Sequence, residues 1–193
     1  MEDADRQHAV AAPPTESEVR GADWYGEDLS GREHTRVAFS GVDLSEATDD
    51  GAVFTECTFR DCRFNLSTHT DAAFLNCTFT GCSFFQATFT DCKFVGSMFE
   101  RCTFDLLTVT GGDWSFVGLP GADLRRATFT GARLREADLT GVRASGASLR
   151  HLDLSAVDPR TLDLSGAQVD VTQAVVLVTA LGLRVSPDVP EPG

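Results

Sequence analysis

Residues 52–64 read Ala52-Val53-Phe54-Thr55-Glu56-Cys57-Thr58-Phe59-Arg60-Asp61-Cys62-Arg63-Phe64. A large apolar residue recurs at every fifth position, a small residue precedes it by two positions, and most other positions are polar. This phase runs without a slip from Trp24 to Val169, over 30 consecutive positions of which 23 are Leu, Phe or Trp. A period of five fits neither the 3.6-residue turn of a helix nor the alternation of a strand.

The five-residue period predicts a short extended piece followed by a turn, repeated along the chain. Thirteen of the 17 glycines share one phase of the repeat, where they can supply the turn. Stacked coils would bury a continuous core, although no single coil could fold alone. We therefore expect an all-β solenoid with the phased large residues inside and Phe85 and Phe116, which lie off phase, outside.

The position two residues before each large residue is small or apolar in most repeats, and all six cysteines occupy it. The cysteines are separated by multiples of five residues, which is not a zinc-ligand spacing. At an inward position, cysteine behaves as a small hydrophobic residue. We expect free buried thiols in a reducing cytoplasm and no bound metal; a redox function of stacked cysteines is the alternative.

Segments such as Gly121-Ala122-Asp123-Leu124-Arg125 and Glu136-Ala137-Asp138-Leu139-Thr140 resemble the repeats of pentapeptide-repeat proteins of the A(D/N)LXX kind. The resemblance covers residues 22–170. It implies a right-handed quadrilateral β-helix with four pentapeptides per coil, a number that the period alone does not provide. Thirty repeats would then make about 7.5 coils and, at ~4.8 Å per coil, a rod about 36 Å long.

Within that family, the chain is most similar to the Qnr- and MfpA-type proteins that protect DNA gyrase from fluoroquinolones. The similarity rests on the near-complete coverage by repeats, on the opening Trp24-Tyr25-Gly26-Glu27-Asp28-Leu29-Ser30, and on the close of the repeat at Val157-Asp158-Pro159. It implies a binding protein that mimics duplex DNA, occupies the DNA site of a type II topoisomerase, chiefly gyrase, and inhibits the enzyme or protects it from quinolone-type poisons.

Both ends of the chain depart from the repeat. Residues 1–20 are polar and are predicted to be a disordered tail, as are residues 185–193. The solenoid is expected over residues 21–169, and a C-terminal capping and dimerisation helix over residues 170–184. In this helix Asp170 is placed at the N-cap, and Gly182 ends the segment.

The expected helix is apolar on more than one side and therefore needs two surfaces to contact. The open strand edge at the end of the solenoid is one of them. A second subunit is the other, and the family resemblance favours a homodimer of rods joined end to end; a simple monomer cap is the alternative. The expected dimer interface comprises Val171, Ala174, Val175, Leu177, Val178 and Leu181.

The net charge of the chain indicates which kinds of partner it can bind. The 193 residues carry 29 acidic and 16 basic side chains, for a net charge of −13, which argues against binding to nucleic acid or to an anionic membrane. No apolar run approaches the ~20 residues of a membrane span, and no secretory leader is recognised. We therefore predict a cytoplasmic protein whose partner is another protein.

With four repeats per coil, every twentieth residue shares a side of the rod. The side that contains Leu29, Phe89 and Phe129 carries seven acidic residues against Arg150 alone. We predict that this acidic face contacts the partner; the alternative is that its charge serves only solubility. The proposed contact residues are Asp28, Asp49, Asp50, Asp71 and Asp91.

A second surface feature is apolar. Leu66, Phe85 and Leu106 are expected to point outward on successive coils and to form a small patch, which on a monomer often marks a contact. Packing along a corner of the coil is the alternative.

No enzyme signature is present. The sequence lacks a phosphate loop and a dinucleotide fingerprint, and we expect no cofactor. No histidine is predicted to lie beside a serine, a cysteine or an acid in a catalytic arrangement. Two other functions remain: a scaffold for an unrelated protein partner, and self-immunity against a gyrase-targeting natural product.

Overall fold

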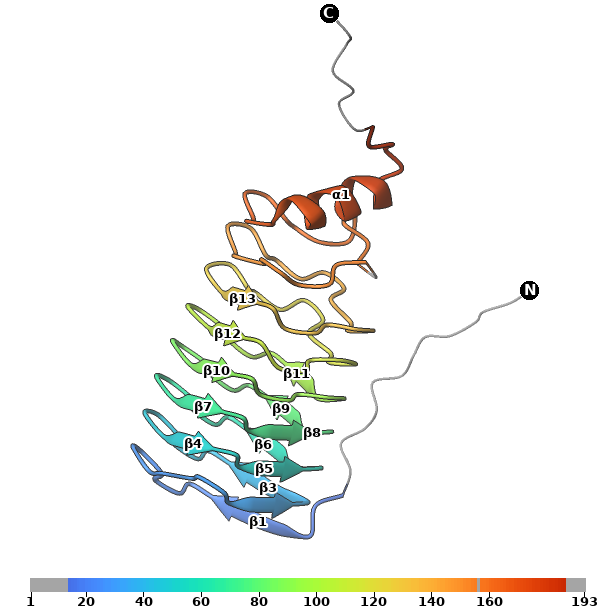
Figure 1. Cartoon of the computed structure of the whole chain (residues 1–193). Coiled ribbons are helices and arrows are strands. Elements are labelled where there is room, and N and C mark those ends of the chain that lie inside the picture. Colours follow the sequence, from blue (N-terminus) through green and yellow to red (C-terminus); the bar gives the residue numbers. More distant parts are fainter. Residues whose placement is uncertain (1–13, 156, 187–193) are drawn as a thin grey trace, which may run out of the picture.

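The computed structural model describes residues 14–155 and 157–186 and shows a parallel β-solenoid (Figure 1). Each strand pairs with the strand one coil away in a register offset of 20 residues, so that Phe39 lies beside Phe59 and Phe59 beside Phe79. One coil therefore holds four five-residue repeats. This confirms the pentapeptide solenoid expected from the sequence.

The strands gather into three parallel sheets. The first sheet contains β1 (Ser17–Arg20), β3 (Val37–Ser40), β6 (Thr58–Arg60), β9 (Thr78–Thr80) and β11 (Met98–Glu100). The second contains β4 (Thr48–Asp50), β7 (Thr68–Thr70), β10 (Thr88–Thr90), β12 (Thr108–Thr110) and β13 (Thr128–Thr130). The third contains β2 (Glu33–Thr35), β5 (Val53–Thr55) and β8 (Ala73–Leu75).

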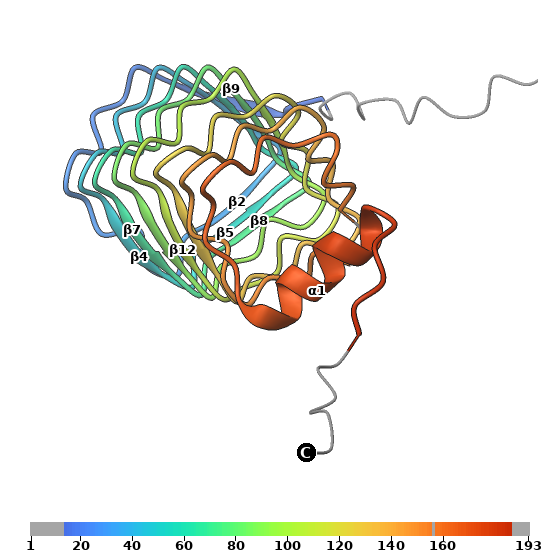
Figure 2. The same ribbon diagram turned by 90° about the horizontal axis from the view of Figure 1, so that it is seen from above.

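The fourth side of the coil is held by single bridges rather than by strands. Asp43, for example, bridges to both Asp23 and Arg63, and Ser83 bridges to Thr103. Similar bridges continue the ladder beyond β13 as far as Gln168. Viewed along the axis, the coils superimpose around a shared interior (Figure 2).

The interior of the N-terminal and middle coils is a stack of aromatic rings. Phe59, Phe79 and Phe99 lie face to face, with ring centroids 4.7 and 4.6 Å apart. Neighbouring columns meet edge to face, which is a favoured aromatic geometry. Off-phase Phe85 and Phe116 are 39% and 50% exposed, as the period predicts.

The cysteines are free, and five of the six are buried. Each thiol donates to backbone carbonyls; the Cys92 thiol, for example, donates to the His69 carbonyl over 3.4 Å. Burial raises the pKa of Cys77, and it raises the pKa of Cys92 to about 12. Because the thiolate is the reactive form, these two side chains are apolar filler rather than reactive groups.

The solenoid starts earlier than predicted. Residues Ser17–Arg20 form β1, which pairs with β3, and Val19 packs against the core. Val19 precedes Trp24 by five residues, so that it takes one more inward position of the same phase. The predicted boundary at residue 20 is therefore wrong for residues 17–20; the predicted tail segments 1–13 and 187–193 lie outside the described residues.

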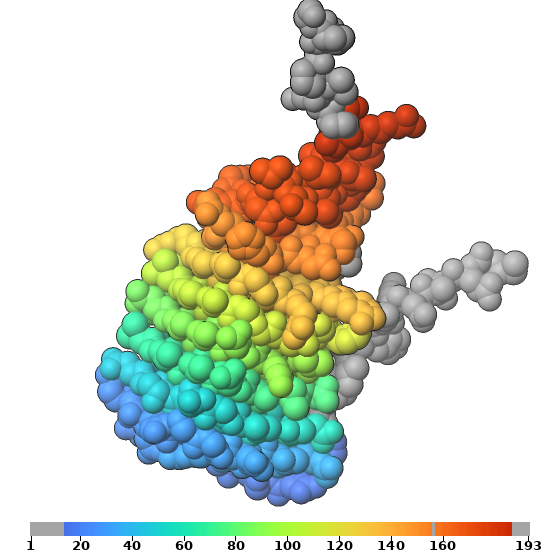
Figure 3. Space-filling view, viewed as in Figure 1, coloured from blue at the N-terminus to red at the C-terminus, as the bar shows by residue number. Residues whose placement is uncertain are grey.

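The helix α1 (Val171–Ala180) closes the C-terminal end of the rod (Figures 1 and 3). Asp170 is its N-cap, as expected, and forms a reciprocal capping box with Gln173. Gln173 is buried, and its Nε2 donates to the carbonyls of Leu149 and Leu152 over 2.6 and 2.9 Å. This one side chain both caps the helix and satisfies the open end of the last coil.

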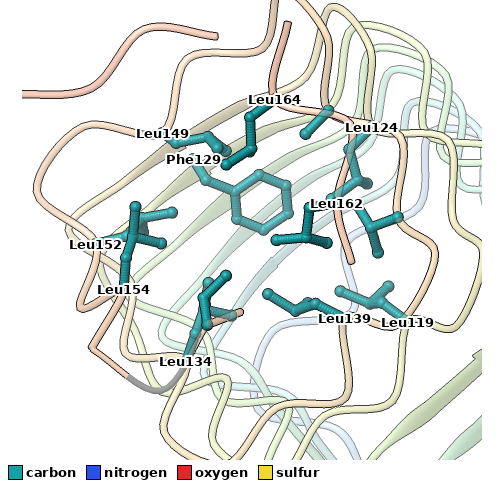
Figure 4. Close-up of a pocket in the computed structure, with 13 residues that line it drawn as sticks. Leu119, Leu124, Phe129, Leu134, Leu139, Leu149, Leu152, Leu154, Leu162 and Leu164 are labelled. Atoms are coloured by element: carbon teal, nitrogen blue, oxygen red, sulfur yellow. The ribbon is translucent and has the colours of Figure 1, made fainter. Parts of the chain in front are cut away.

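Near the C-terminus, leucines replace the phenylalanines of the core. They enclose an apolar cavity of about 30 Å³ inside the coils below α1 (Figure 4). Such a small apolar space stays dry. Its lining includes Leu119, Leu134, Leu139, Leu154 and Leu162.

Candidate protein-binding surface

The sheet β4–β7–β10–β12–β13 is the acidic face of the sequence analysis. Its middle residues point inward, and the residues on either side point to the surface, as the alternating burial shows. Most of these outward residues are threonines that stack in register from coil to coil. The face is therefore a flat threonine sheet, with acids at its N-terminal end and along one edge.

Three of the five proposed contact residues lie along that edge. Asp50, Asp71 and Asp91 belong to successive coils and are exposed. Within residues 14–155 and 157–186, none of the three carboxylates has a hydrogen-bond or ion-pair partner. Asp71 and Asp91 occupy the same position of the repeat on adjacent coils, and Asp50 occupies the preceding position, in register with Thr70. We call these three residues the acidic edge, and like charges gathered in this way favour a cationic partner.

Asp28 lies on the same sheet but beside its opposite edge. Its carboxylate accepts hydrogen bonds from the backbone N–H and the hydroxyl of Ser30, at 2.9 and 2.6 Å. The Ser30 hydroxyl is the main reason that the pKa of Asp28 is lowered. Asp28 is exposed, so it can still contact a partner while it shapes the turn.

Asp49 cannot be a contact residue, and this part of the prediction is wrong. Its side chain takes the inward position of β4, is buried, and pairs with Nδ1 of His69 one coil above. The other ring nitrogen of His69 lies 2.9 Å from the Ser67 hydroxyl. The phase of the repeat places Asp49 inside, where burying its carboxyl group without a hydrogen-bond partner would be costly.

The Asp49–His69–Ser67 network was not predicted from the sequence. Its signal was present, because residues 49 and 69 are one coil apart at inward positions of the same column. The order of groups resembles a hydrolase triad, but all three side chains are buried in the solenoid core. The Ser67 hydroxyl donates to the Phe64 carbonyl over 2.7 Å, so its proton is engaged within the core.

Many other aspartates have a structural task that the sequence analysis also missed. An aspartate just before the inward residue accepts a hydrogen bond from the N–H two residues later, as Asp43 does from Ser45 and Asp163 from Ser165. This contact mimics a backbone turn. Part of the negative charge therefore shapes the coil, whereas the acidic edge makes no such contact.

The predicted apolar patch lies on the side of the rod that is held by bridges. Leu66 and Phe85 are 48% and 39% exposed, and Leu106 is partly exposed. The backbone N–H of Leu66 donates to the Phe85 carbonyl, so these residues lie on adjacent coils. The patch is thus separate from the acidic edge.

The expected dimer residues divide between two sides of α1. Leu177 is partly buried and packs against the core of its own chain. Val171 and Val175 are 82% and 40% exposed, and Leu181, which caps the helix, is 51% exposed. Ala174 and Val178 are partly exposed.

Metal and membrane features are absent from the part of the chain that the structure describes. No group of three or more His, Cys, Asp or Glu side chains is arranged to hold a metal ion there. None of its helices has the length and apolar character needed to cross a bilayer.

Comparison with known proteins agrees with the geometry. The family profile named Pentapeptide repeats matches residues 122–158 in eight copies. No curated protein matches the chain. Among solved structures, HetL, a pentapeptide repeat protein involved in heterocyst differentiation regulation in the cyanobacterium Nostoc sp. Strain PCC 7120, is 18% identical; the match covers 80% of this chain and 84% of HetL, with a TM-score of 0.51.

QnrB1, a plasmid-mediated fluoroquinolone resistance protein, also matches. A trypsin-treated variant is 17% identical over 88% of this chain and 99% of QnrB1, with a TM-score of 0.41. The full-length protein is 20% identical over 86% of this chain and 100% of QnrB1, with a TM-score of 0.35. At its identity and TM-score, the HetL structure supports the fold alone.

Proposed function

Because the chain is a pentapeptide-repeat solenoid, we propose that it is a DNA-mimicking protein that binds a type II topoisomerase, DNA gyrase. The observation that carries this proposal is the acidic edge: the carboxylates of Asp50, Asp71 and Asp91 are exposed on successive coils and have no partner among the described residues. The sequence resemblance to Qnr- and MfpA-type proteins supplies the identity of the partner. The net charge of −13 supports the same direction.

A DNA-binding site is basic because it must meet phosphate. Duplex DNA presents one negative charge per ~1.7 Å of its axis. The acidic edge presents one carboxylate per coil, or about one per 4.8 Å of rod. The rod therefore imitates the duplex more in shape than in charge density, and its affinity should be sensitive to salt.

The length of the rod is part of the proposal. One chain of about 36 Å covers only part of a DNA-binding site, whereas two rods joined through α1 reach roughly 70 Å, comparable with about 20 base pairs. The exposed side chains of Val171, Val175 and Leu181 supply the surface for this homodimer. Their burial would remove apolar area from water, which is the main driving force for such an association.

Occupation of the DNA site accounts for both proposed effects on the enzyme. A bound rod competes with DNA and so inhibits supercoiling. It also lowers the amount of the cleaved-DNA complex on which quinolone-type poisons act.

The test is a gyrase supercoiling assay with the purified protein, with and without ciprofloxacin. The proposal expects inhibition of supercoiling in proportion to the protein added, and less drug-induced cleavage. If the protein binds gyrase but protects only against a different gyrase poison, a self-immunity function replaces drug protection. If supercoiling and cleavage are both unchanged, the protein is a scaffold for another partner.

A further inference from the structure

Positive charge is concentrated in the later coils of this acidic protein. Residues 14–100 hold 15 acidic and six basic side chains, whereas residues 121–150 hold six arginines and three acids. The rod is therefore electrically polar along its length, and the proposed gyrase contact uses only its acidic part.

Four arginines line one surface groove of about 810 Å³ on the side of the rod that is held by bridges. This volume is within the range of about 300–1,000 Å³ that is typical of ligand sites. The basic lining residues are Arg101, Arg125, Arg126 and Arg143, and the acidic ones are Asp105 and Asp123. The lining thus has an excess of positive charge.

The two acids hold three of the four arginines in place without using all their N–H donors. Asp123 accepts from Arg125 at 2.6 Å and from Arg143 at 3.0 Å. Asp105 lies 3.3 Å from Arg126. A guanidinium has five N–H donors, so each of these arginines keeps several for an external carboxylate, which it can bind in a bidentate manner.

The apolar patch adjoins this groove. Phe85 lies one coil below Asp105, since the N–H of Gln86 donates to the Asp105 carbonyl and Ser83 bridges to Thr103. Both Thr103 and Asp105 belong to the groove lining. Aromatic side chains and arginines are both enriched in protein interfaces, so Phe85 beside the arginines has the composition of a contact surface.

We propose that the arginine groove and the patch Leu66–Phe85–Leu106 form a second docking surface, which takes an extended acidic segment of a protein partner. Carboxylates of the segment pair with the arginines of the groove, and its apolar side chains cover Phe85 and its two leucine neighbours.

Charge along the rod favours such a segment over nucleic acid. A duplex long enough to fill the groove would also extend beside the earlier coils, whose excess of acids repels phosphate. A short acidic segment avoids that region. It also has apolar side chains to offer to the patch, which a phosphate backbone does not. The surface differs from the acidic edge, so it stands independently of the gyrase proposal.

The test measures binding of fluorescein-labelled probes to the full chain by fluorescence anisotropy. The probes are a short peptide that alternates glutamate with leucine, the corresponding lysine–leucine peptide, and a short DNA duplex. We expect saturable binding of the glutamate–leucine peptide alone, weakening as salt rises. Absence of saturable binding of this peptide overturns the proposal, as does preferential binding of the duplex.

Matched variants locate the site. Arg125→Gln with Arg126→Gln should weaken peptide binding about tenfold or more, as expected for lost charge-assisted contacts. Arg60→Gln with Arg150→Gln removes the same charge elsewhere and should leave binding unchanged. Phe85→Ser should weaken binding, whereas Phe116→Ser, at an exposed phenylalanine on another corner, should not.

If a variant and its control lose the same amount of peptide affinity, the peptide responds only to net charge or to nonspecific apolar contact. That result contradicts the proposal. Thermal unfolding of every variant checks that the fold is kept. All six substituted side chains are exposed, so loss of the fold is not expected.

Discussion

At the scale of single residues, the inward column of Leu29, Asp49, His69 and Phe89 shows how a solenoid accommodates polar groups. The side chains of Asp49 and His69 pair in adjacent coils, and His69 stacks on Phe89 with ring centroids 4.7 Å apart. One oxygen of Asp49, Oδ1, has no hydrogen-bond partner among the described residues. The pair therefore leaves one buried polar atom unsatisfied and does not give the core its greatest stability.

Breaking the pair and replacing it should have opposite effects. Asp49→Ala leaves His69 buried without its partner and should lower the free energy of unfolding by about 3–5 kcal/mol. Asp49→Leu combined with His69→Phe fills the column with apolar side chains and should be neutral or stabilising, by up to about 4 kcal/mol. Chemical denaturation of both variants checks this; a double variant less stable than the single one would refute the account of the pair.

A surface pair should make stability depend on pH. The Arg63 guanidinium donates to Asp43 over 2.6 Å and is the main reason that the pKa of Asp43 is lowered from 3.8 to about 2. The lowered pKa means that ionised Asp43 stabilises the folded chain above pH 3.8, and that this contribution disappears as the pH falls towards 2.

Arg63→Gln should accordingly be less stable than the wild type at pH 7, and the difference should shrink near pH 2. Denaturation at the two pH values measures it. A difference that is the same at both would show that Arg63 acts through packing of its alkyl chain and not through Asp43.

At the scale of elements, the five-residue period predicts where the strands lie, but it does not predict the hydrogen bonds that the polar side chains make. The strands could be placed from the sequence because every inward residue obeys one phase, and β1 was missed only because Val19 was not counted in it. The direction of Asp49 could also have been read from that phase. Gln173 bonds to carbonyls 21 and 24 residues earlier in the chain, which a linear pattern does not reveal. The turn-forming aspartates bond within two residues, but the five-residue phase does not distinguish them from aspartates that only carry surface charge.

The helix α1 should separate folding from dimerisation. Gln173→Ala leaves the carbonyls of Leu149 and Leu152 without their donor and should lower stability by about 1–3 kcal/mol. Val171 and Val175 lie on the exposed side of α1. The double variant Val171→Glu, Val175→Glu should therefore keep the fold but be a monomer. Sedimentation and thermal unfolding measure the two effects; a wild type that is monomeric at micromolar concentration would end the dimer proposal.

At the scale of the whole molecule, the rod changes along its length. Phenylalanine fills the early and middle coils, leucine fills the late ones, and a cavity marks the difference. Charge follows a similar division, with the acidic edge in the early coils and the arginine groove in the late ones. The two ends of the solenoid are thus specialised, although the backbone repeats.

Filling the cavity should stabilise the late coils. At ~24 cal/mol per Å³, the 30 Å³ space corresponds to about 0.7 kcal/mol. Leu134→Phe, above Trp114 in its column, should therefore raise the melting temperature by about 2 °C. Leu44→Phe, at a position with no such space, should lower it through overpacking. A destabilised Leu134→Phe variant would show that the cavity cannot accept a ring.

The most direct test of the central claim measures displacement of a labelled DNA duplex from gyrase by the protein. The wild type should displace the duplex. The triple variant Asp50→Asn, Asp71→Asn and Asp91→Asn should require about tenfold more protein, since several charge contacts are lost together. The matched control, Glu33→Gln, Asp61→Asn and Glu100→Gln, changes the net charge equally away from the threonine sheet and should behave as the wild type. Displacement that is equal for all three proteins would contradict DNA mimicry by the acidic edge.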